Sequence, residues 1–290
     1  MRPPKFLLKY QKLNKKFKIL KMKAKTMQKK IINYFNFFIY KIISLGLRHK
    51  KIKTYFGSFK LLTNTSNEVH RAITFNEKEP ETINWINDFK SEDDSDVVFF
   101  DVGANIGIYS LYACHRHPNS KVFSFEPDSQ SFASLSKNIF INKFKAIPYP
   151  IALSSESGIG AVYLSSMSAG AGACALGEKY TFSNTDDFDI FKQGIYFCTI
   201  DELVFEFGLP CPNYIKIDVD GIEERILSGA RRVMESTNLK GILVEFQYKN
   251  ESDLSEIINK LASCGFKLIL KSNWINKFED LNSRNYVFSK

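Results

Sequence analysis

The most informative stretch of the sequence is FFDVGANIGIYSL, residues 99–111. An apolar strand ends at Asp101, and Gly103 and Gly107 then bracket a tight turn into a helix. Glycines let the backbone approach a ligand closely, and a helix N-terminus offers free N–H groups. The next predicted strand ends at Glu126, where an acid is placed to accept both hydroxyls of a ribose. These features predict an adenosine-nucleoside site at the carboxyl edge of a sheet.

The spacing of the glycines distinguishes between nucleoside ligands. A dinucleotide fold needs G-x-G-x-x-G, with a middle glycine that makes room for a pyrophosphate. Here the spacing is G-x-x-x-G, and the charge of Asp101 would repel any phosphate nearby. An acid at that place suits the ammonium group of a methionine moiety. The motif therefore favours S-adenosylmethionine over NAD.

Short apolar segments alternate with helix-like segments around this motif. Continuous apolar runs are typical of strands that are buried on both faces of a parallel sheet. The predicted strands are VVFFDV (97–102), KVFSFE (121–126), AIPYPIAL (146–153), NYIKIDV (213–219) and GILVEF (241–246), and FKLIL with NYVFS predicts a closing C-terminal β-hairpin. The pattern predicts an α/β fold with a doubly wound, mostly parallel, seven-stranded sheet.

Helix signals occur between these strands. Pro80 is expected in the first turn of a helix over ETINWINDFK, Asp128 is a plausible N-cap, and Thr199 with Glu202 forms a capping-box pattern. One helix is predicted over GIEERILSGARRVMES and another over DLSEIINKLASC. Residues 165–194 are rich in Ser, Gly and Asp and are expected to form a loop, either a lid over an acceptor or an insert.

The formal charge of +9 is an average over two unlike parts. Residues 1–60 contain eighteen Lys and Arg and no acid, which leaves 22 basic residues against 31 acidic ones in the rest of the chain. We divide the chain into a basic N-terminal segment, 1–53, and a main domain, 54–290. Five scattered cysteines without a CxxC pair argue against a zinc site or a disulfide framework and suit a reducing compartment.

The basic segment continues into IINYFNFFIYKIISLGL, residues 31–47. This run is interrupted by Asn and Lys and is short for a membrane span. Two interpretations are about equal: an interfacial helix that holds residues 1–50 on an anionic membrane, or a segment that packs on protein. We therefore expect a cytoplasmic enzyme, peripheral on the inner face of the membrane under the first interpretation.

A second group of acids follows the strand NYIKIDV. Asp218 ends the strand at the same edge of the sheet as the nucleoside site, and Asp220 shares its face if the strand continues. A hydroxyl acceptor of a methyl group needs alignment and a base, for which Asp218 is the first candidate, followed by Asp220 and Glu223. The converging acids could instead bind a divalent cation. Glu224 reads as a complement to the helix dipole, and Glu245 is a weaker acceptor-pocket candidate.

Three ordered blocks, FFDVGANIGIYS, VFSFEP and IKIDVDGIEERILSGA, resemble the FkbM-type methyltransferases, as does TIDEL at 199–203. The resemblance covers roughly residues 70–270 and implies a Rossmann-like class I fold and O-methylation of sugar or polyketide hydroxyls. It implies that the methionine part of the cofactor is held around the glycine turn, and the ribose at the tip of the second strand. The expected cofactor residues are Asp101, Gly103, Ala104, Asn105, Gly107, Glu126 and Pro127. One departure is Asp220, where the family usually has Glu, so the carboxylate is kept but its reach shortens.

Other functions remain as alternatives. An RNA methyltransferase could use the basic tail to hold phosphates, although the acidic main domain does not favour a nucleic-acid partner. A non-catalytic, membrane-bound scaffold could keep the cofactor site without turnover. We expect a small-molecule or glycan acceptor, as in polysaccharide biosynthesis.

Overall fold

In the computed structural model, Met1–Arg48 is one unit of the chain and His49–Lys290 is another. Its first strand begins at His49, so residues 49–53 belong to this unit and not to the N-terminal segment to which the sequence assigned them. The residues that the structure describes are Met27, Phe38, 49–90, 97–171, 174–176, 191–219, 221–248, 251–272, 276–278 and 281–290.

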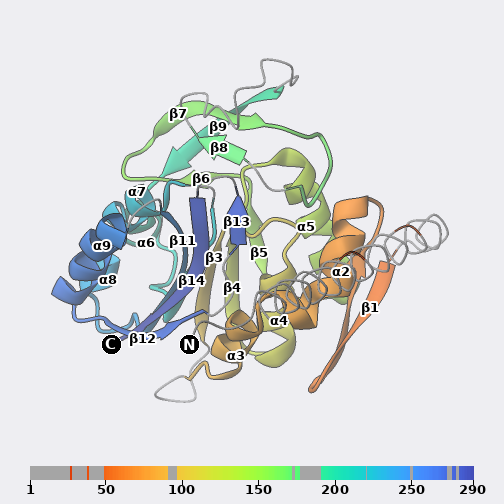
Figure 1. The fold of residues 1–290 in the computed structure, drawn as a ribbon, viewed down its shortest axis with the longest axis horizontal. Coiled ribbons are helices and arrows are strands. Elements are labelled where there is room, and N and C mark those ends of the chain that lie inside the picture. Colours follow the sequence, from red (N-terminus) through yellow and green to blue (C-terminus); the bar gives the residue numbers. More distant parts are fainter. Residues whose placement is uncertain are drawn as a thin grey trace, which may run out of the picture. The chain divides into compact units, whose positions relative to one another are not determined.

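A large sheet forms the centre of the unit (Figure 1). Its strand order is β12-β14-β11-β10-β3-β4-β5, and β13 pairs with β14 off this path. The five strands from β11 to β5 are parallel, whereas β14 is antiparallel to both β11 and β12. The strands are β3 (Val98–Val102), β4 (Lys121–Phe125), β5 (Ile147–Tyr149), β10 (Tyr214–Ile217), β11 (Gly241–Tyr248), β12 (Lys267–Lys271), β13 (Asn276–Phe278) and β14 (Leu281–Ser289). This confirms the mostly parallel, doubly wound sheet and the antiparallel C-terminal strands.

Helices cover both faces of the sheet because its central strands are apolar on both sides. All five residues of β3 are buried, with Phe99 in one core cluster and Phe100 in the other. On one face lie α2 (Ser66–Lys78), α3 (Pro80–Asn87), α4 (Ile108–Arg116) and α5 (Ser129–Asn142). On the other lie α6 (Ile200–Phe205), α7 (Glu223–Ser228), α8 (Arg231–Glu235) and α9 (Glu251–Ser263).

The predicted helix starts are largely confirmed. Pro80 occupies the first turn of α3, the Asp128 carboxylate accepts from two backbone N–H groups of α5, and the Thr199 hydroxyl accepts from the N–H of Glu202. The sequence did not predict the hairpin of β1 (His49–Thr54) and β2 (Gly57–Leu62), nor α2. A complete capping box begins α2, formed by Thr65 and Glu68.

A second, smaller sheet lies above the carboxyl ends of the large one (Figure 1). It has the order β6-β9-β7-β8 and consists of β6 (Ala152–Leu153), β7 (Gly158–Leu164), β8 (Cys174–Leu176) and β9 (Phe191–Cys198). The expected loop over 165–194 was therefore wrong in part, because β8 and the start of β9 fall within it. The start of β7 lacks the alternation of apolar and polar side chains that would predict a strand, because two of its positions are glycines. The ring of Phe197 packs over the backbone of Gly158 and Gly160 in place of side chains there.

The predicted single helix over 221–236 is instead two short helices, α7 and α8, which break at Gly229. A Cβ at Gly229 would lie 2.1 Å from the backbone oxygen of Ser154. The chain after β6 passes too close to this turn for any side chain.

We expect Gly229→Ala to destabilise the protein by about 1–3 kcal/mol, the usual cost of forcing an atom into a packed site. The φ of −80° at Gly229 suits alanine, so the cost is steric and not conformational. Gly194→Ala is the matched control, because a Cβ there meets no atom within 4 Å and its effect should stay within about 0.5 kcal/mol. Urea unfolding measures both free energies, and equal stabilities of the two variants would contradict the close approach.

Candidate active site

Polar residues form one row along the carboxyl edge of the large sheet. Glu126 and Gly103 follow the paired residues at the ends of β4 and β3, and Asp218 follows the end of β10 in the same register. Glu245 of β11 comes next, and Asn285 of β14 is its register partner. Neighbouring positions in register present their side chains on the same face, so the fold brings together residues that are up to 182 positions apart.

The turn after β3 has room for glycine alone at position 103. The φ of Gly103 is +76°, and a Cβ there would lie 2.0 Å from the backbone oxygen of Asp218. The N–H groups of Gly103 and Ala104 both donate to the backbone oxygen of Phe125, at 3.0 and 3.1 Å. The turn is thus fixed against β4 on one side and β10 on the other.

A pocket of about 640 Å³, its open mouth included, lies between this edge and the small sheet. Its polar lining comes from the large sheet and α5, and Leu153 and Val162 of the small sheet supply part of its apolar lining. Four of the expected cofactor residues line it, namely Gly103, Asn105, Glu126 and Pro127, together with the proposed base Asp218. The other three, Asp101, Ala104 and Gly107, are not among the lining residues that the structure describes.

Glu126 lies in the wall of this pocket and is held by the backbone. One carboxylate oxygen accepts from the N–H of Asn105 at 2.7 Å, and the other accepts from the N–H of Asp128 at 2.8 Å. Burial raises the pKa of Glu126 to about 8, although both of these hydrogen bonds act in the opposite direction. In its protonated form the group still offers one O–H donor and a free lone pair, which fits a pair of ligand hydroxyls.

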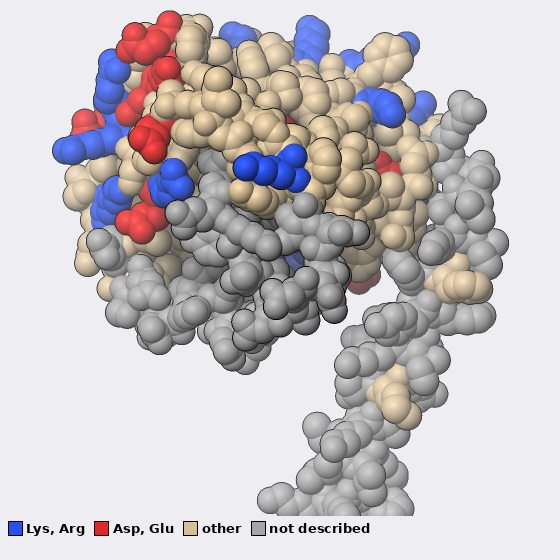
Figure 2. All heavy atoms as spheres, turned by 90° about the horizontal axis from the view of Figure 1, so that it is seen from above, with Lys and Arg blue, Asp and Glu red and all other residues tan. Residues whose placement is uncertain are grey.

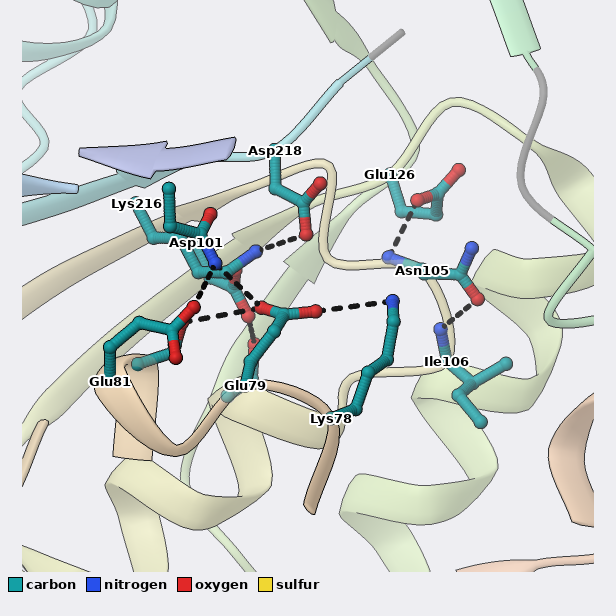
Figure 3. A network of polar contacts seen from close by, with 12 residues as sticks. Lys78, Glu79, Glu81, Asp101, Asn105, Ile106, Glu126, Lys216 and Asp218 are labelled. Atoms are coloured by element: carbon teal, nitrogen blue, oxygen red, sulfur yellow. Dashed lines mark hydrogen bonds and ion pairs between the residues drawn. The ribbon is translucent and has the colours of Figure 1, made fainter. Parts of the chain in front are cut away.

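A buried ionic network lies beneath the pocket (Figure 3). The ammonium of Lys216 lies 2.6 Å from one carboxylate oxygen of Asp218, and Lys216 is only 1% exposed. Asp101 pairs with Lys216 in the register of β3 and β10 and accepts a hydrogen bond from the Ser110 hydroxyl. Asp101 is 1% exposed, so the structure places it among these groups instead of in the pocket where we expected a ligand ammonium.

The network keeps Asp218 ionised. Burial acts to raise the pKa of Asp218, but the Lys216 ammonium and a hydrogen bond with Glu245 hold it well below its usual range. Burial acts to lower the pKa of Lys216, but the carboxylates of Asp218 and Asp101 raise it above its usual value. Sequence reasoning missed Lys216, whose signal was a lone Lys two positions before Asp218 in an apolar strand.

The remaining acids of the predicted catalytic group are placed differently. Asp220 lies outside the described residues. Glu223 begins α7, is 4% exposed and accepts from the N–H of Gly221, so it stabilises the turn after β10. Glu224 is exposed in the first turn of α7, as expected of a residue that complements the helix dipole.

Metal and thiol chemistry find little support in the described part of the chain. No group of three or more His, Cys, Asp or Glu there is arranged to hold a metal ion. His115 contacts the Thr54 hydroxyl, and His117 contacts the backbone oxygen of Ile86. Burial raises the pKa of the Cys114 and Cys198 thiols to about 12, so both remain protonated at neutral pH.

The raised pKa of Glu126 predicts a pH-dependent stability. Because its folded pKa, about 8, exceeds its ordinary value of 4.5, the ligand-free protein should lose stability as the pH rises through this window. The side chain of Glu126→Gln stays neutral at every pH. The difference in free energy of unfolding between the wild type and this variant should therefore change by about 2–4 kcal/mol between pH 4.5 and 8.5. Urea unfolding at a series of pH values measures this difference. If the free energies of unfolding of the two proteins change with pH in parallel, Glu126 does not have a raised pKa in the folded protein.

Comparison with known proteins agrees with this geometry. Residues 101–268 match the Methyltransferase FkbM domain, a region that contains the glycine turn, Glu126 and Asp218. The chain is 28% identical over 190 residues to the hexuronic acid methyltransferase AglP of Haloferax volcanii, covering 65% of this chain and 70% of that one. It is 26% identical over 196 residues to the 31-O-demethyl-FK506 methyltransferase FkbM of Streptomyces tacrolimicus, covering 61% and 75%.

Among solved structures, precorrin-6y C5,15-methyltransferase of Geobacter metallireducens aligns with 74% of this chain and 87% of its own, at 16% identity and a TM-score of 0.41. The family match covers more than half of the sequence and includes the carboxyl end of each strand that contributes to the pocket lining. The chain belongs to the FkbM family of S-adenosylmethionine-dependent methyltransferases, and its large sheet has the class I fold.

Proposed function

We propose that the pocket binds S-adenosylmethionine and that the enzyme methylates a hydroxyl group of a sugar-like acceptor. The observation that carries the proposal is the row Glu126–Gly103–Asp218 along one edge of the sheet. A carboxylate for the ribose, a turn without a side chain and a second carboxylate follow one another in the order that the parts of the cofactor require. The apolar lining from Leu153 and Val162 suits the adenine end.

The bound cofactor would supply an activated methyl group on a positively charged sulfur. Glu126 would hold the ribose hydroxyls through the O–H donor and the lone pair that the backbone leaves available, and the turn at Gly103 would let the methionine part lie against the main chain. Asp218 would lie toward the acceptor, because it lines the same pocket and its side chain is 28% exposed.

The low pKa of Asp218 suits a late transfer of the acceptor's proton. An ionised carboxylate accepts a hydrogen bond from the acceptor hydroxyl and thereby aims an oxygen lone pair at the methyl group. As the new C–O bond forms, the hydroxyl becomes strongly acidic, so even a weak base can take its proton. Asp218 would thus align the acceptor first and remove the proton afterwards. Glu245 lies next to Asp218 in the register of the sheet edge and extends the site along it.

The acceptor class rests on the relatives. AglP is named for hexuronic acid methylation, and the Streptomyces protein for methylation at an oxygen of an FK506 derivative. Both names support a hydroxyl or carboxyl oxygen as acceptor, and the first supports a sugar.

An RNA acceptor has less support from the charges on the surface. Figure 2 shows acidic and basic side chains side by side at the left edge of this face, mostly uncharged side chains across the middle, and separate basic side chains at the top and right. The ion pair of Glu206 with Arg232 joins the end of α6 to α8, and the pair of Glu156 with Arg225 joins the turn between β6 and β7 to α7. On the described part of this face, basic residues form no continuous track for phosphates.

To test the catalytic role, Asp218→Asn should lower turnover by about 100-fold, the scale of general-base effects. Asp101 remains beside Lys216 in this variant and limits the charge left unpaired. Turnover is measured as transfer of labelled methyl into a glycan fraction, with an RNA fraction in parallel, and is normalised to the protein that binds S-adenosylhomocysteine. Glu224→Gln, an exposed acid on α7, is the control and should keep full turnover. Near-normal turnover of Asp218→Asn would place the base elsewhere, and label in RNA alone would refute the sugar acceptor.

We also propose that residues 1–48 hold the enzyme on an anionic membrane surface. No helix among the described residues is both long and apolar enough to cross a bilayer, and nearly all of the basic segment lies outside them. The support is the acid-free run of Lys and Arg, each of which contributes about 1 kcal/mol near anionic lipid.

A truncation that begins at His49 keeps β1 intact and should leave vesicles that contain anionic lipid, while still binding S-adenosylhomocysteine. Added salt should weaken the attachment of the full chain, because it screens exposed charges. Co-sedimentation with vesicles measures both effects. Unchanged sedimentation of the truncated protein would remove this role from the segment.

A further inference from the structure

Lys216 is a charged residue in β10, a fully buried central strand of the sheet. Its neighbours in β10 are Tyr214, Ile215 and Ile217, and all four residues are buried. Removing an ammonium from water costs several kcal/mol, and an apolar residue of similar size is often equally or more stabilising at such a position. The needs of the core alone therefore do not explain a lysine here.

The groups around the Lys216 ammonium come from several elements. Asp218, directly after the end of β10, lies 2.6 Å away, Asp101 is the register partner on β3, and the ring of Tyr109 on α4 lies 4.9 Å from the ammonium. The charge of Glu79, between α2 and α3, also acts on Lys216. One cation thus serves carboxylates from three separate segments of the chain.

Asp218 connects this network to the pocket. Lys216 is 1% exposed, whereas the side chain of Asp218 is 28% exposed and lines the pocket. Its other titratable neighbours are Glu245 in the middle of β11 and Lys78 at the end of α2. If the ion pair only stabilised the core, both of its side chains would be fully buried. Here one partner, Asp218, faces the pocket.

We propose that Lys216 is a positioning residue for methyl transfer: its buried ammonium fixes one oxygen of Asp218 and keeps that carboxylate charged toward the positively charged methyl donor. The proposal deepens the function above and rests on Asp218 facing the bound cofactor. Lys216 itself touches neither the donor nor the acceptor.

Without the ammonium, two buried carboxylates would remain on adjacent strands with no cation between them. Burial and like-charge repulsion both raise a carboxyl pKa, so Asp218 should begin to bind a proton in the neutral range. Below that pH the pocket would lose a negative charge near the sulfonium. Lys216→Met tests this, because methionine fills a similar volume without charge.

The measurement compares two ligands that differ in charge at sulfur. S-adenosylmethionine carries a positive sulfonium, and S-adenosylhomocysteine carries a neutral sulfur, so the ratio of their dissociation constants reports the local charge. Calorimetry between pH 5.5 and 7.5 gives this ratio for the wild type, where its change with pH reports the ligand's own ionisation and that of Glu126, whose pKa is about 8. Both contributions are common to every variant, so each variant's ratio is divided by the wild-type ratio at the same pH. In Lys216→Met the preference for the sulfonium should rise about fivefold or more from pH 5.5 to 7.5, a change expected for one nearby charge.

Three further variants make the result decisive. Lys121→Met, at an exposed position at the start of β4, should behave as the wild type. Lys216→Met combined with Asp218→Asn should show no pH dependence, because the titrating group is gone. Lys216→Met combined with Asp101→Asn leaves Asp218 without the ammonium but removes one buried acid, so it should fold at least as well as the single variant. Its preference for the sulfonium should also rise with pH, because Asp218 is still buried without a cation.

A flat ratio in both Lys216→Met and its Asp101→Asn combination would overturn the proposal. So would a pH dependence that persists in the combination with Asp218→Asn, because Asp101 would then be the group that Lys216 serves. Failure of the wild type to bind either ligand would overturn the proposed function and this role with it, which separates the two outcomes.

Discussion

The close approach of two backbone segments at Gly103 is the constraint on which the site depends. The turn after β3 passes so near the end of β10 that a Cβ at Gly103 would lie 2.0 Å from the Asp218 backbone oxygen. Two N–H groups of the same turn donate to the end of β4. The contact brings the ends of three parallel strands together, and with them the carboxylates of Glu126 and Asp218. A larger residue at position 103 would separate the two halves of the pocket.

The two carboxylates share one sheet edge but have opposite electrostatic surroundings. Glu126 is buried with only backbone donors around it, so burial dominates and its pKa is raised. Asp218 is next to the Lys216 ammonium, which outweighs burial and lowers its pKa. The first is suited to hydrogen-bonding neutral hydroxyls, and the second to a permanent negative charge beside a sulfonium. Position in the register alone would not distinguish them, whereas the residues beneath them do.

The sequence predicted those parts of the site that depend on local backbone chemistry. Gly103, Asn105, Glu126 and Pro127 line the pocket as expected, because a strand, a glycine turn and an acid at the next strand end have few other arrangements. The mostly parallel sheet also followed, since continuous apolar runs between helices favour parallel strands. The glycine turn and the acid at the next strand end were therefore predictable without knowledge of distant contacts.

The remainder depends on packing between distant segments. Asp101 was expected to face a ligand, but the register with Lys216 and the hydroxyl of Ser110 place it beneath the pocket. The helix breaks at Gly229 because the backbone there contacts Ser154, and the residues around Gly229 in the sequence do not predict that contact. The sequence did not predict the small sheet, because Phe197 packs on two glycines of β7 and the strand therefore lacks alternating apolar and polar side chains.

A crystal structure of the protein with S-adenosylhomocysteine would test the arrangement most directly. The ribose hydroxyls should lie within hydrogen-bond distance, about 2.5–3.0 Å, of the Glu126 carboxylate. The methionine part should follow the turn at Gly103, with the sulfur on the side of Asp218. A ligand bound in the opposite direction, with its ribose beside Asp218, or bound outside this pocket, would contradict the arrangement.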